Sequence, residues 1–454
     1  MAEQIETLAR FVAETTLAQV PAEVQRYAKL VALDTIGVIL AGAERHEVRA
    51  LRDRLVPTAG TGATVQAPGW PASDPRTAAL LNGIAGRAIE LGEGHRYVSY
   101  QGAMQILPGV LSVGEASGRT GADMLAALIL GYDAGARLGA AMKTRPLAHQ
   151  NGQAALLGAA AAGARLRGLD APQTSLAMRL ATTLVLTPSY NNAMNGATTL
   201  NVAGGMSGVA LSLAPDLALA GFTAQDDAIE EALAKLVGDG FDASNLLDGL
   251  GTRWEITRNW LRLRACCNPI YAALDALEQT VADLKAKADD VARIDVATFR
   301  FASVMRHPDP PNYFASKYSL PHVAACLVVR GSTGFSAVDD SALADPAIAA
   351  MRHRVHIVED PAMTPSVPAL KPARVTLTLR DGRKATRSCD SPRGDCLNPY
   401  DEREIRQKFR ELAGRALTPQ GLDEVERAVD ALERWLSGAV LPDLLRRHGR
   451  ADWR

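Results

Sequence analysis

The sequence predicts a mostly helical fold with a large all-helical domain and a smaller α+β domain. Through the first half of the chain, apolar residues recur every three or four positions, the period of a helix with one buried face. In the second half, a stretch alternates with period two and carries Asp381-Gly382, a hairpin-turn signal, before the helical pattern returns. We therefore predict a discontinuous helical domain, residues 1–263 and 397–454, and an α+β lid domain, residues 264–396.

The helices of the first domain are separated by short glycine or proline breaks. Ile5, Leu8 and Val12 share one face of the first helix, and Pro21 stands where a proline opens the next one. Further helices are predicted at residues 77–89, 107–117, 122–138, 152–167 and 172–186. Because alanine and glycine are frequent here and only 5% of the chain is aromatic, we expect a core of closely packed helices with small side chains.

The second domain is expected to contain three strands and two helices. The alternating runs fall at residues 291–304, 353–358 and 373–387, and the helical periods fall at residues 271–287 and 320–329. Beyond Pro399, the run KFRELAGRAL and two later segments read as helices. These last helices are expected to rejoin the first domain.

The composition favours a small-molecule ligand over a macromolecular partner. The 454 residues carry 49 basic and 50 acidic side chains with no long block of one sign, which argues against nucleic acid or an anionic membrane as the main partner. Five cysteines without a CxxC pair indicate reduced thiols in a cytoplasm-like compartment. No targeting segment is visible, and the apolar run near Ala154–Ala164 is too short to span a bilayer. The expected location is cytoplasmic.

The stretch from Leu81 to Pro108 is the first candidate for chemistry. Glu90 and Glu93 stand three residues apart, so both carboxylates lie on one face if the helix continues through them, as paired acid and base groups require. Glycines on either side let the backbone approach a ligand. A solvated helix end followed by a loop is the alternative reading of the same pattern.

Six segments, in order, resemble the MmgE/PrpD enzymes, which include 2-methylcitrate dehydratase, cis-aconitate decarboxylase and iminodisuccinate epimerase. They are LNGIAGRAIELGEG, ILPGVLSVGEASGRTGADMLAALILGYDAGARLG, AHQNGQAALLGAAAAGARLRGLD, LRACCNPIYAALDAL, ASKYSLPHVAACLVVRG and LNPYDEREIRQKFRELA. The resemblance implies a helical domain built from both chain ends, a smaller α+β lid, a site between them and a homodimer. It implies no cofactor and no metal, and the sequence likewise contains no Walker A loop, no GxGxxG after a strand and no clustered metal ligands.

The resemblance assigns several candidate site residues in the first half of the chain. Glu90 takes the position of the family's first acidic residue, as a base or as a group that orients one. His149 matches a family histidine and ranks first among the acid/base candidates, because its charge can change near neutral pH. Gly94 and Gln101 replace a threonine and a histidine, so Gln101 can hydrogen-bond a substrate but cannot carry a proton. A helix-capping surface histidine is the alternative for His149.

Further candidates lie around the domain boundary and in the second domain. Ala197 replaces a family lysine, and Thr199 beside it can still bind a ligand through its hydroxyl. Arg262 takes the place of a lysine and is expected to bind a substrate carboxylate, with a surface charge as the alternative. Lys317 matches the lysine of the family's AKFSLPY motif, and His322 stands at its tyrosine. His95 and Tyr100 also lie in the opening stretch, without a role that the family fixes.

Three functions remain open on these observations. Family members take a proton from a carbon next to a carboxylate of a small di- or tricarboxylate, a step that needs a base, cations for the carboxylates and donors for the developing oxyanion. The resemblance favours a lyase, either dehydratase-like or decarboxylase-like. The lost proton carriers favour an epimerase or isomerase of a dicarboxylate such as iminodisuccinate. A non-catalytic carboxylate-binding relative is the third possibility.

Overall fold

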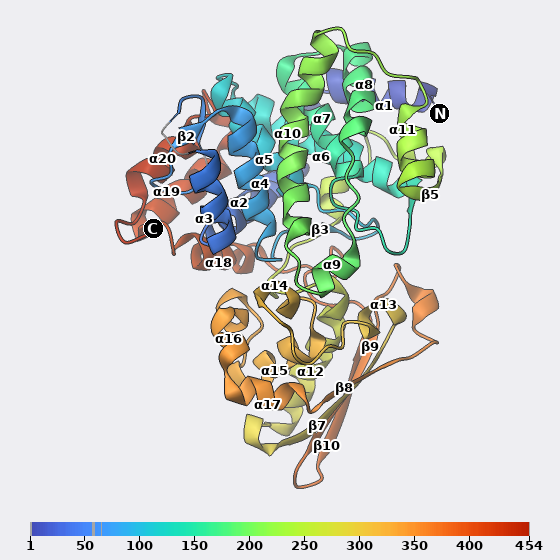
Figure 1. The fold of residues 1–454 in the computed structure, drawn as a ribbon, viewed down its shortest axis with the longest axis vertical. Helices are drawn as coiled ribbons and strands as arrows, with labels where there is room; N and C mark the ends of the chain where they lie inside the picture. The colour runs from blue at the N-terminus through green and yellow to red at the C-terminus, as the bar shows by residue number, and fades with distance from the viewer. Residues whose placement is uncertain (1, 57–59, 65, 454) are drawn as a thin grey trace. The chain divides into compact units, whose positions relative to one another are not determined.

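The computed structural model describes residues 2–56, 60–64 and 66–453, and the backbone divides into two compact units (Figure 1). Unit 1 comprises the described residues up to Tyr190, Thr199–Asn259 and those from Asp401 onward. Unit 2 comprises Asn191–Thr198 and Trp260–Tyr400. The boundaries therefore fall a few residues from the expected positions, and one short segment before Thr199 joins unit 2.

Unit 1 is a helical body. Its α-helices are α1 (Ala2–Glu14), α2 (Ala22–Gly42), α3 (His46–Leu55), α4 (Pro75–Arg87), α5 (Ala103–Ala116), α6 (Gly121–Ala141), α7 (Ala154–Arg167), α8 (Ala171–Leu180), α10 (Thr199–Leu219), α11 (Ala228–Glu230), α18 (Glu402–Ala413), α19 (Pro419–Asp430) and α20 (Val440–His448). Short 3-10 or π-helical turns are η1 (Leu17–Gln19), η2 (Ala181–Leu184), η3 (Glu231–Leu236), η4 (Ala243–Leu246), η5 (Glu255–Arg258) and η10 (Leu432–Arg434). Its short strands are β1 (Ala63–Thr64), β2 (Ala72–Ser73), β3 (Gly94–His95), β4 (Met142–Thr144) and β5 (Gly238–Phe241).

Small residues allow the central helices of unit 1 to approach closely, as the composition predicted. A Cβ atom on Gly83 of α4 would lie 2.5 Å from the carbonyl oxygen of Gly204 on α10, so neither position has room for a side chain. A similar restriction holds between Gly163 of α7 and Leu211 of α10. At these two crossings, α4 and α7 therefore pack against the backbone of α10.

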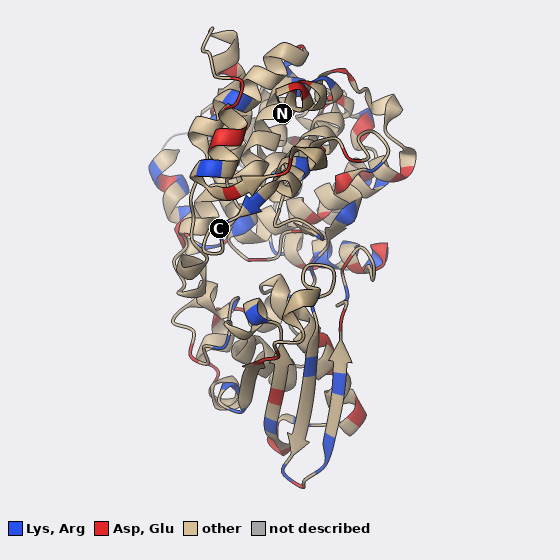
Figure 2. Cartoon of the chain, turned by 90° about the vertical axis from the view of Figure 1, so that its right-hand side faces the viewer, with Lys and Arg blue, Asp and Glu red and all other residues tan. Residues whose placement is uncertain are grey.

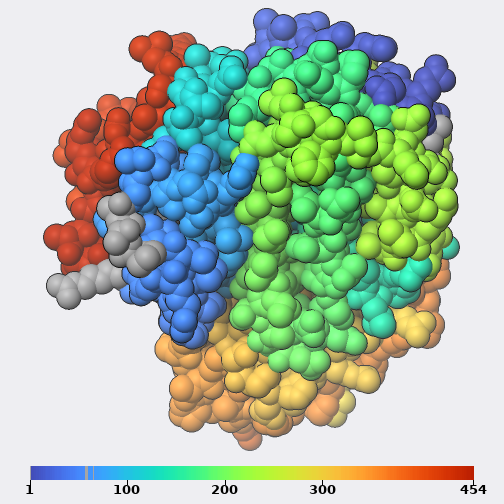
Figure 3. Space-filling view, turned by 45° about the horizontal axis from the view of Figure 1, so that its top comes forward, coloured from blue at the N-terminus to red at the C-terminus, as the bar shows by residue number. Residues whose placement is uncertain are grey.

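The C-terminal helices belong to the same unit as the N-terminal ones. Lys408 on α18 forms a buried ion pair with Asp34 on α2, with 2.7 Å between Nζ and Oδ1, and also donates to the carbonyl oxygen of Leu91 at 2.8 Å. Figure 3 shows these C-terminal residues, in red, against residues of the first hundred, in blue. The chain ends thus share one core, which makes the helical unit discontinuous.

Unit 2 is an α+β body with a mixed sheet. Its elements are α9 (Tyr190–Met194, whose first residue lies in unit 1), β6 (Asn259–Trp260, at the boundary), η6 (Asn268–Ile270), α12 (Tyr271–Leu284), η7 (Ala288–Asp290), β7 (Val291–Thr298), α13 (Arg300–Ser303), α14 (Tyr313–Ser316), α15 (Leu320–Arg330), η8 (Phe335–Val338), α16 (Asp340–Ala344), α17 (Pro346–Arg352), β8 (Val355–Glu359), η9 (Thr364–Ser366), β9 (Ala373–Leu379) and β10 (Lys384–Cys389). The four-stranded sheet has the order β10-β9-β7-β8, with β7 and β8 parallel and the other pairs antiparallel.

The three alternating runs and the two helical segments expected in unit 2 are confirmed, although the third run forms two strands and further short helices are present. The Asp381-Gly382 turn joins β9 to β10, and Gly382 has a φ of 89°, which suits glycine. The first strand was expected to run to Val304, but β7 ends at Thr298 and α13 follows. The alternation of apolar residues in this run changes phase near Thr298 because the strand ends there.

Two long apolar helices are mostly core helices. By length and composition, α6 and α10 could cross a membrane, but 89% of the most apolar window of α6 and 56% of that of α10 are buried inside the protein. In the view of Figure 2, Lys and Arg residues are interspersed with Asp and Glu residues.

Candidate functional site

Glu90 does not continue the helix that precedes it. Asp74 caps the start of α4 by accepting the backbone N–H groups of Arg76 and Thr77, at 3.0 and 3.1 Å, and the helix ends at Arg87. Glu90 follows in the left-handed region with a φ of 52°, a strained conformation for a residue other than glycine. Its carboxylate forms a buried ion pair with the Arg87 guanidinium. Backbone strain maintained by a buried ion pair is typical of functional sites.

Glu93 points elsewhere, so the expectation that the two carboxylates share a helix face is wrong. One of its oxygens accepts the backbone N–H of Ala103 at 2.7 Å, and the other accepts the hydroxyl of Tyr132 at 2.9 Å. Because the chain leaves the helical path after Arg87, residues three apart no longer share a face. Glu93 anchors the start of α5 instead.

Three buried amide side chains form a cluster near the starts of α5 and α7. Asn151 Nδ2 donates to Gln101 Oε1 at 3.1 Å, and Gln105 Nε2 donates to the carbonyl oxygen of Gln101 at 2.7 Å. Gln105 Oε1 accepts the N–H of Gly152 at 2.8 Å and the hydroxyl of Ser207 at 3.1 Å. We call Gln101, Gln105 and Asn151 the carboxamide cluster. It fixes two loops and α10 to one another.

The carboxamide cluster leaves one donor unused. Gln101 is only 3% exposed, and its Nε2 has no hydrogen-bond partner among the residues that the structure describes. A buried N–H group without a partner costs about 1–3 kcal/mol relative to a paired one. A protein is expected to keep such an unpaired N–H group where a bound ligand accepts the missing hydrogen bond.

His149 lies next to the carboxamide cluster. Its Nδ1 accepts the backbone N–H of Asn151 at 3.3 Å, and its ring packs on Tyr190 with 4.3 Å between ring centroids. An Nδ1 that accepts a hydrogen bond places the hydrogen of a neutral imidazole on Nε2. In this tautomer His149 offers a donor at Nε2, which suits a carboxylate or an oxyanion better than it suits proton abstraction.

Asn201, in the first turn of α10, is a second buried amide without partners. It is 2% exposed, and within the described part of the chain neither Oδ1 nor Nδ2 has a hydrogen-bond partner. Gly204 and Gly205, one turn further along α10, contact the Gly83 and Leu80 backbones of α4, and a Cβ on Gly204 would lie 3.6 Å from Arg87 Cβ. Asn201 therefore faces α4 at the level of Arg87, next to the turn that carries Glu90.

These contacts place several helix ends together. Gln105 and Gly152 connect the N-terminal ends of α5 and α7, and Gly86 at the end of α4 lies against Met104 in the first turn of α5. The N-terminal turns of α5, α7 and α10 thus lie beside the C-terminal end of α4, where their dipoles favour an anion. We call Glu90, Gln101, His149 and Asn201 the helix-end site.

The other predicted residues of unit 1 have varied environments. His95 Nδ1 accepts the backbone N–H groups of Tyr97 and Val98, both at 3.2 Å, and its Nε2 lies 3.0 Å from Glu255 Oε2, while burial lowers its pKa. Tyr100 is buried, donates to the carbonyl oxygen of Tyr132 at 3.2 Å, and has a pKa raised well above 10.0 by burial. Gly94 is buried in β3 and Thr199 is exposed at the start of α10. His95 and Tyr100 thus support the loop that leads to Gln101.

The predicted residues of unit 2 are interior groups. Lys317 is fully buried, donates to the carbonyl oxygen of Val338, and has its Nζ 3.9 Å from the centre of the Tyr313 ring. His322 is fully buried with Nε2 3.6 Å from Cys326 Sγ, and burial together with the charges of Arg352, Lys317 and Arg330 lowers its pKa to about 3. Arg262 is 5% exposed. With that pKa, His322 is a poor proton carrier near pH 7.

Sequence reasoning missed the residues that hold the helix-end site in place. Arg87 pairs with Glu90, Lys408 holds the Leu91 carbonyl, and Gln105 joins α5 to α7 and α10. Arg87 follows an apolar helical run and had no pattern that predicted full burial. Among the residues described, no group of three or more His, Cys, Asp or Glu side chains is arranged to hold a metal ion.

Comparison with known proteins now identifies the family. Residues 6–242 match the model of the MmgE/PrpD N-terminal domain, and residues 265–434 match that of the MmgE/PrpD C-terminal domain. The chain belongs to the MmgE/PrpD family. The resemblance and the fold class predicted from the sequence are both confirmed.

Curated relatives of the chain are fungal and mammalian members of the family. A cis-aconitate decarboxylase of Aspergillus terreus is 24% identical over 401 residues, covering 82% of this chain and 81% of the relative. A cis-aconitate decarboxylase-like protein of Aspergillus oryzae is 24% identical and covers 79% and 80% of the two chains. The cis-aconitate decarboxylase of Mus musculus is 24% identical over 159 residues, covering 35% of this chain and 32% of the relative. These likenesses support an enzyme of the lyase kind.

Proposed function

We propose that this protein is a cofactor-independent lyase that removes a proton next to a carboxylate of a small di- or tricarboxylate. The observation that carries the proposal is the helix-end site. There a strained Glu90 and His149 lie beside buried amide atoms that have no hydrogen-bond partner. Its relatives' names, which include cis-aconitate decarboxylase, support a lyase of polycarboxylates.

In the proposed reaction, Glu90 accepts the proton. The C–H bond next to the substrate carboxylate breaks, its electron pair moves into that carboxylate to form an enediolate, and the proton goes to the Glu90 carboxylate. A leaving group on the neighbouring carbon then departs with its bonding electrons and leaves an alkene. Glu90 suits this role because it is the carboxylate of the helix-end site, and its ion pair with Arg87 fixes its position.

Two neutral donors suit a developing negative charge. They are the amide nitrogens of Gln101 and Asn201, which have no hydrogen-bond partner among the described residues. The neighbouring imidazole of His149 carries its hydrogen on Nε2. Donors that are already in place when charge develops typically contribute 10²–10³-fold each to such reactions, about 2.7–4 kcal/mol. The N-terminal ends of α5, α7 and α10 add a favourable dipole. Gln101 thus keeps a binding role although it cannot carry a proton.

The deciding experiment is solvent deuterium exchange. The protein is incubated in deuterated water with a panel containing cis-aconitate, citrate, succinate and iminodisuccinate, and each carbon next to a carboxylate is followed by NMR. Deuterium uptake together with a new alkene signal or loss of carbon dioxide supports the lyase. Uptake without loss of any group would instead indicate the epimerase that the lost proton carriers favour. No uptake on any panel member that raises the melting temperature would leave a binding protein and overturn the proposal.

A further inference from the structure

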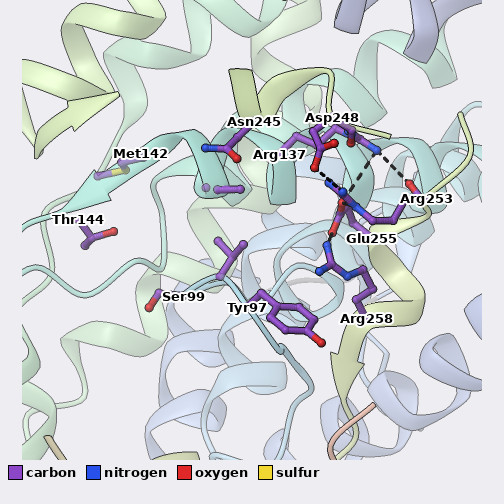
Figure 4. Close-up of a pocket in the computed structure, with 13 residues that line it drawn as sticks. Tyr97, Ser99, Arg137, Met142, Thr144, Asn245, Asp248, Arg253, Glu255 and Arg258 are labelled. Atoms are coloured by element: carbon purple, nitrogen blue, oxygen red, sulfur yellow. Dashed lines mark hydrogen bonds and ion pairs between the residues drawn. The ribbon is translucent and has the colours of Figure 1, made fainter. Parts of the chain in front are cut away.

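A polar cavity lies in unit 1, outside the helix-end site. It has a volume of about 400 Å³, within the size range of small-ligand pockets. Its walls come from the loop at Tyr97–Ser99, the end of α6, β4, and the segment from η4 to η5. In Figure 4, Met142 and Thr144 stand on one side of the hollow and Arg253, Glu255 and Arg258 on the other.

The carboxylate of Glu255, on the cavity wall, is already paired. Glu255 Oε1 accepts from Arg253 Nε at 2.8 Å, and Oε2 accepts from Arg258 Nη1 at 3.0 Å and lies 3.0 Å from His95 Nε2. Burial alone would raise the pKa of Glu255, but the hydrogen bonds from His95 and Arg253 and the charge of Arg258 lower it to about 2. Glu255 is therefore a carboxylate with three donors around it.

Arg137 is also fully occupied and has a structural role. Its Nε pairs with Asp133, Nη1 donates to the carbonyl oxygen of Asp248 at 2.7 Å, and Nη2 donates to that of Arg253 at 2.9 Å. Longer bonds to two further carbonyl oxygens at 3.4 Å account for its remaining N–H groups. This arginine fixes the backbone of the cavity wall and offers nothing to a ligand.

Arg258 keeps unused donors in the cavity. Within the described part of the chain, Arg258 uses only Nη1, so the edge formed by its Nε and Nη2 has no acceptor. The Arg258 guanidinium lies 4.2 Å from the centre of the Tyr97 ring, which holds its plane in position. The side-chain amide of Asn245, on the wall of the same cavity, has no hydrogen-bond partner among the described residues. The planar edge of an arginine suits the two oxygens of a carboxylate, and an amide can donate to one of them.

We propose that this cavity is a second binding site for a small carboxylate anion, held by Arg258 and Asn245. Its position connects it with the helix-end site through one loop. The backbone N–H of His95 donates to the carbonyl oxygen of Tyr100 at 2.7 Å and closes the loop that lines the cavity. Gln101 is the next residue after this loop. A carboxylate in the cavity therefore restrains the loop that carries Gln101. The proposal does not depend on the reaction assigned to the helix-end site.

Isothermal titration calorimetry with citrate at pH 7.5 tests the site. Asn245→Asp places a negative charge on the cavity wall without touching the Glu255 cluster, and Arg258→Gln removes the free guanidinium edge. Each variant is expected to weaken one citrate site at least tenfold. Arg54→Gln, which changes an exposed arginine on α3 outside the cavity, is the matched control and should bind citrate as the original protein does.

Hydrogen exchange of the loop supplies a second readout. Citrate should slow the amide exchange of residues 95–99 in the original protein and in Arg54→Gln, but not in Asn245→Asp. Citrate binding that is unchanged in both cavity variants, or slowing of these amides that survives Asn245→Asp, would overturn the proposal. Failure of deuterium exchange at the helix-end site would leave these results unaffected, so the two proposals can fail separately.

Discussion

The helix-end site of unit 1 and the Lys317–His322 cluster of unit 2 both contain buried polar side chains, but they differ in what those side chains still offer. In the helix-end site, both atoms of the Asn201 amide and Nε2 of Gln101 have no partner. In unit 2, Lys317 already donates to Val338, and the unpaired Nδ1 of His322 belongs to a ring whose pKa is about 3. Unused donors indicate a site for an anionic ligand, whereas a histidine that burial and neighbouring cations keep neutral has a structural role in the interior.

The largest expected effect comes from the proposed base. Glu90→Gln keeps the hydrogen-bonding shape but removes the proton acceptor, so deuterium exchange into the best panel substrate should fall by about 10²–10⁴-fold. His149→Gln keeps a side-chain N–H donor but cannot carry a proton, so with Glu90 as the base its loss should be much smaller than that of Glu90→Gln. The exchange rates are measured by NMR, with His356→Gln, an exposed histidine on β8, as the control. Exchange that survives Glu90→Gln but disappears in His149→Gln would reverse the two roles.

The second prediction concerns the pH dependence of unit 2. Because the pKa of His322 is about 3 when folded and about 6.5 in an unfolded chain, the unfolded state binds the extra proton between these values. Stability is therefore complete above pH 6.5 and declines as the pH falls toward 3, by about 2 kcal/mol between pH 7 and pH 5. This decline should appear in the free energy of opening of the α15 amides. That free energy is measured by hydrogen exchange, with a correction for the intrinsic pH dependence of the exchange rate.

His322→Gln should remove most of that decline, and His356→Gln should retain it. A decline that His322→Gln left unchanged would contradict the conclusion that His322 is a neutral interior group. A histidine with an ordinary pKa would then be available for proton transfer in unit 2, as the sequence suggested.

The smallest effect is expected for Asn201. Asn201→Leu removes a buried amide without partners, so the free energy of unfolding should rise by about 1 kcal/mol. The same change should abolish the stabilisation by the best panel carboxylate, because the site loses a donor. Thermal unfolding with and without ligand measures both. Asn151→Leu is the matched contrast, because its amide is hydrogen-bonded to Gln101 and its loss should destabilise the protein.

The fold was largely accessible from the sequence, whereas the site was accessible only in part. The periodic runs located the helices of unit 1, and Asp381-Gly382 located the β9–β10 hairpin, because both signals are local. Glu90 was a candidate from its spacing to Glu93, and Gln101 and His149 were candidates from the family resemblance; the structure brings Gln101 and His149 next to Asn151. The helical face proposed for Glu90 and Glu93 failed because the backbone leaves the helix after Arg87.

What the sequence determined by itself was the set of elements and the family, since both depend on residue order along the chain. The tertiary structure decided which partners the polar groups have. Lys408 reaches Asp34 and the Leu91 carbonyl across more than three hundred residues, and Asn201 remains without a partner in the interior. Such pairings depend on how helices pack, and the same side chain can be a structural tie or an open donor according to that packing.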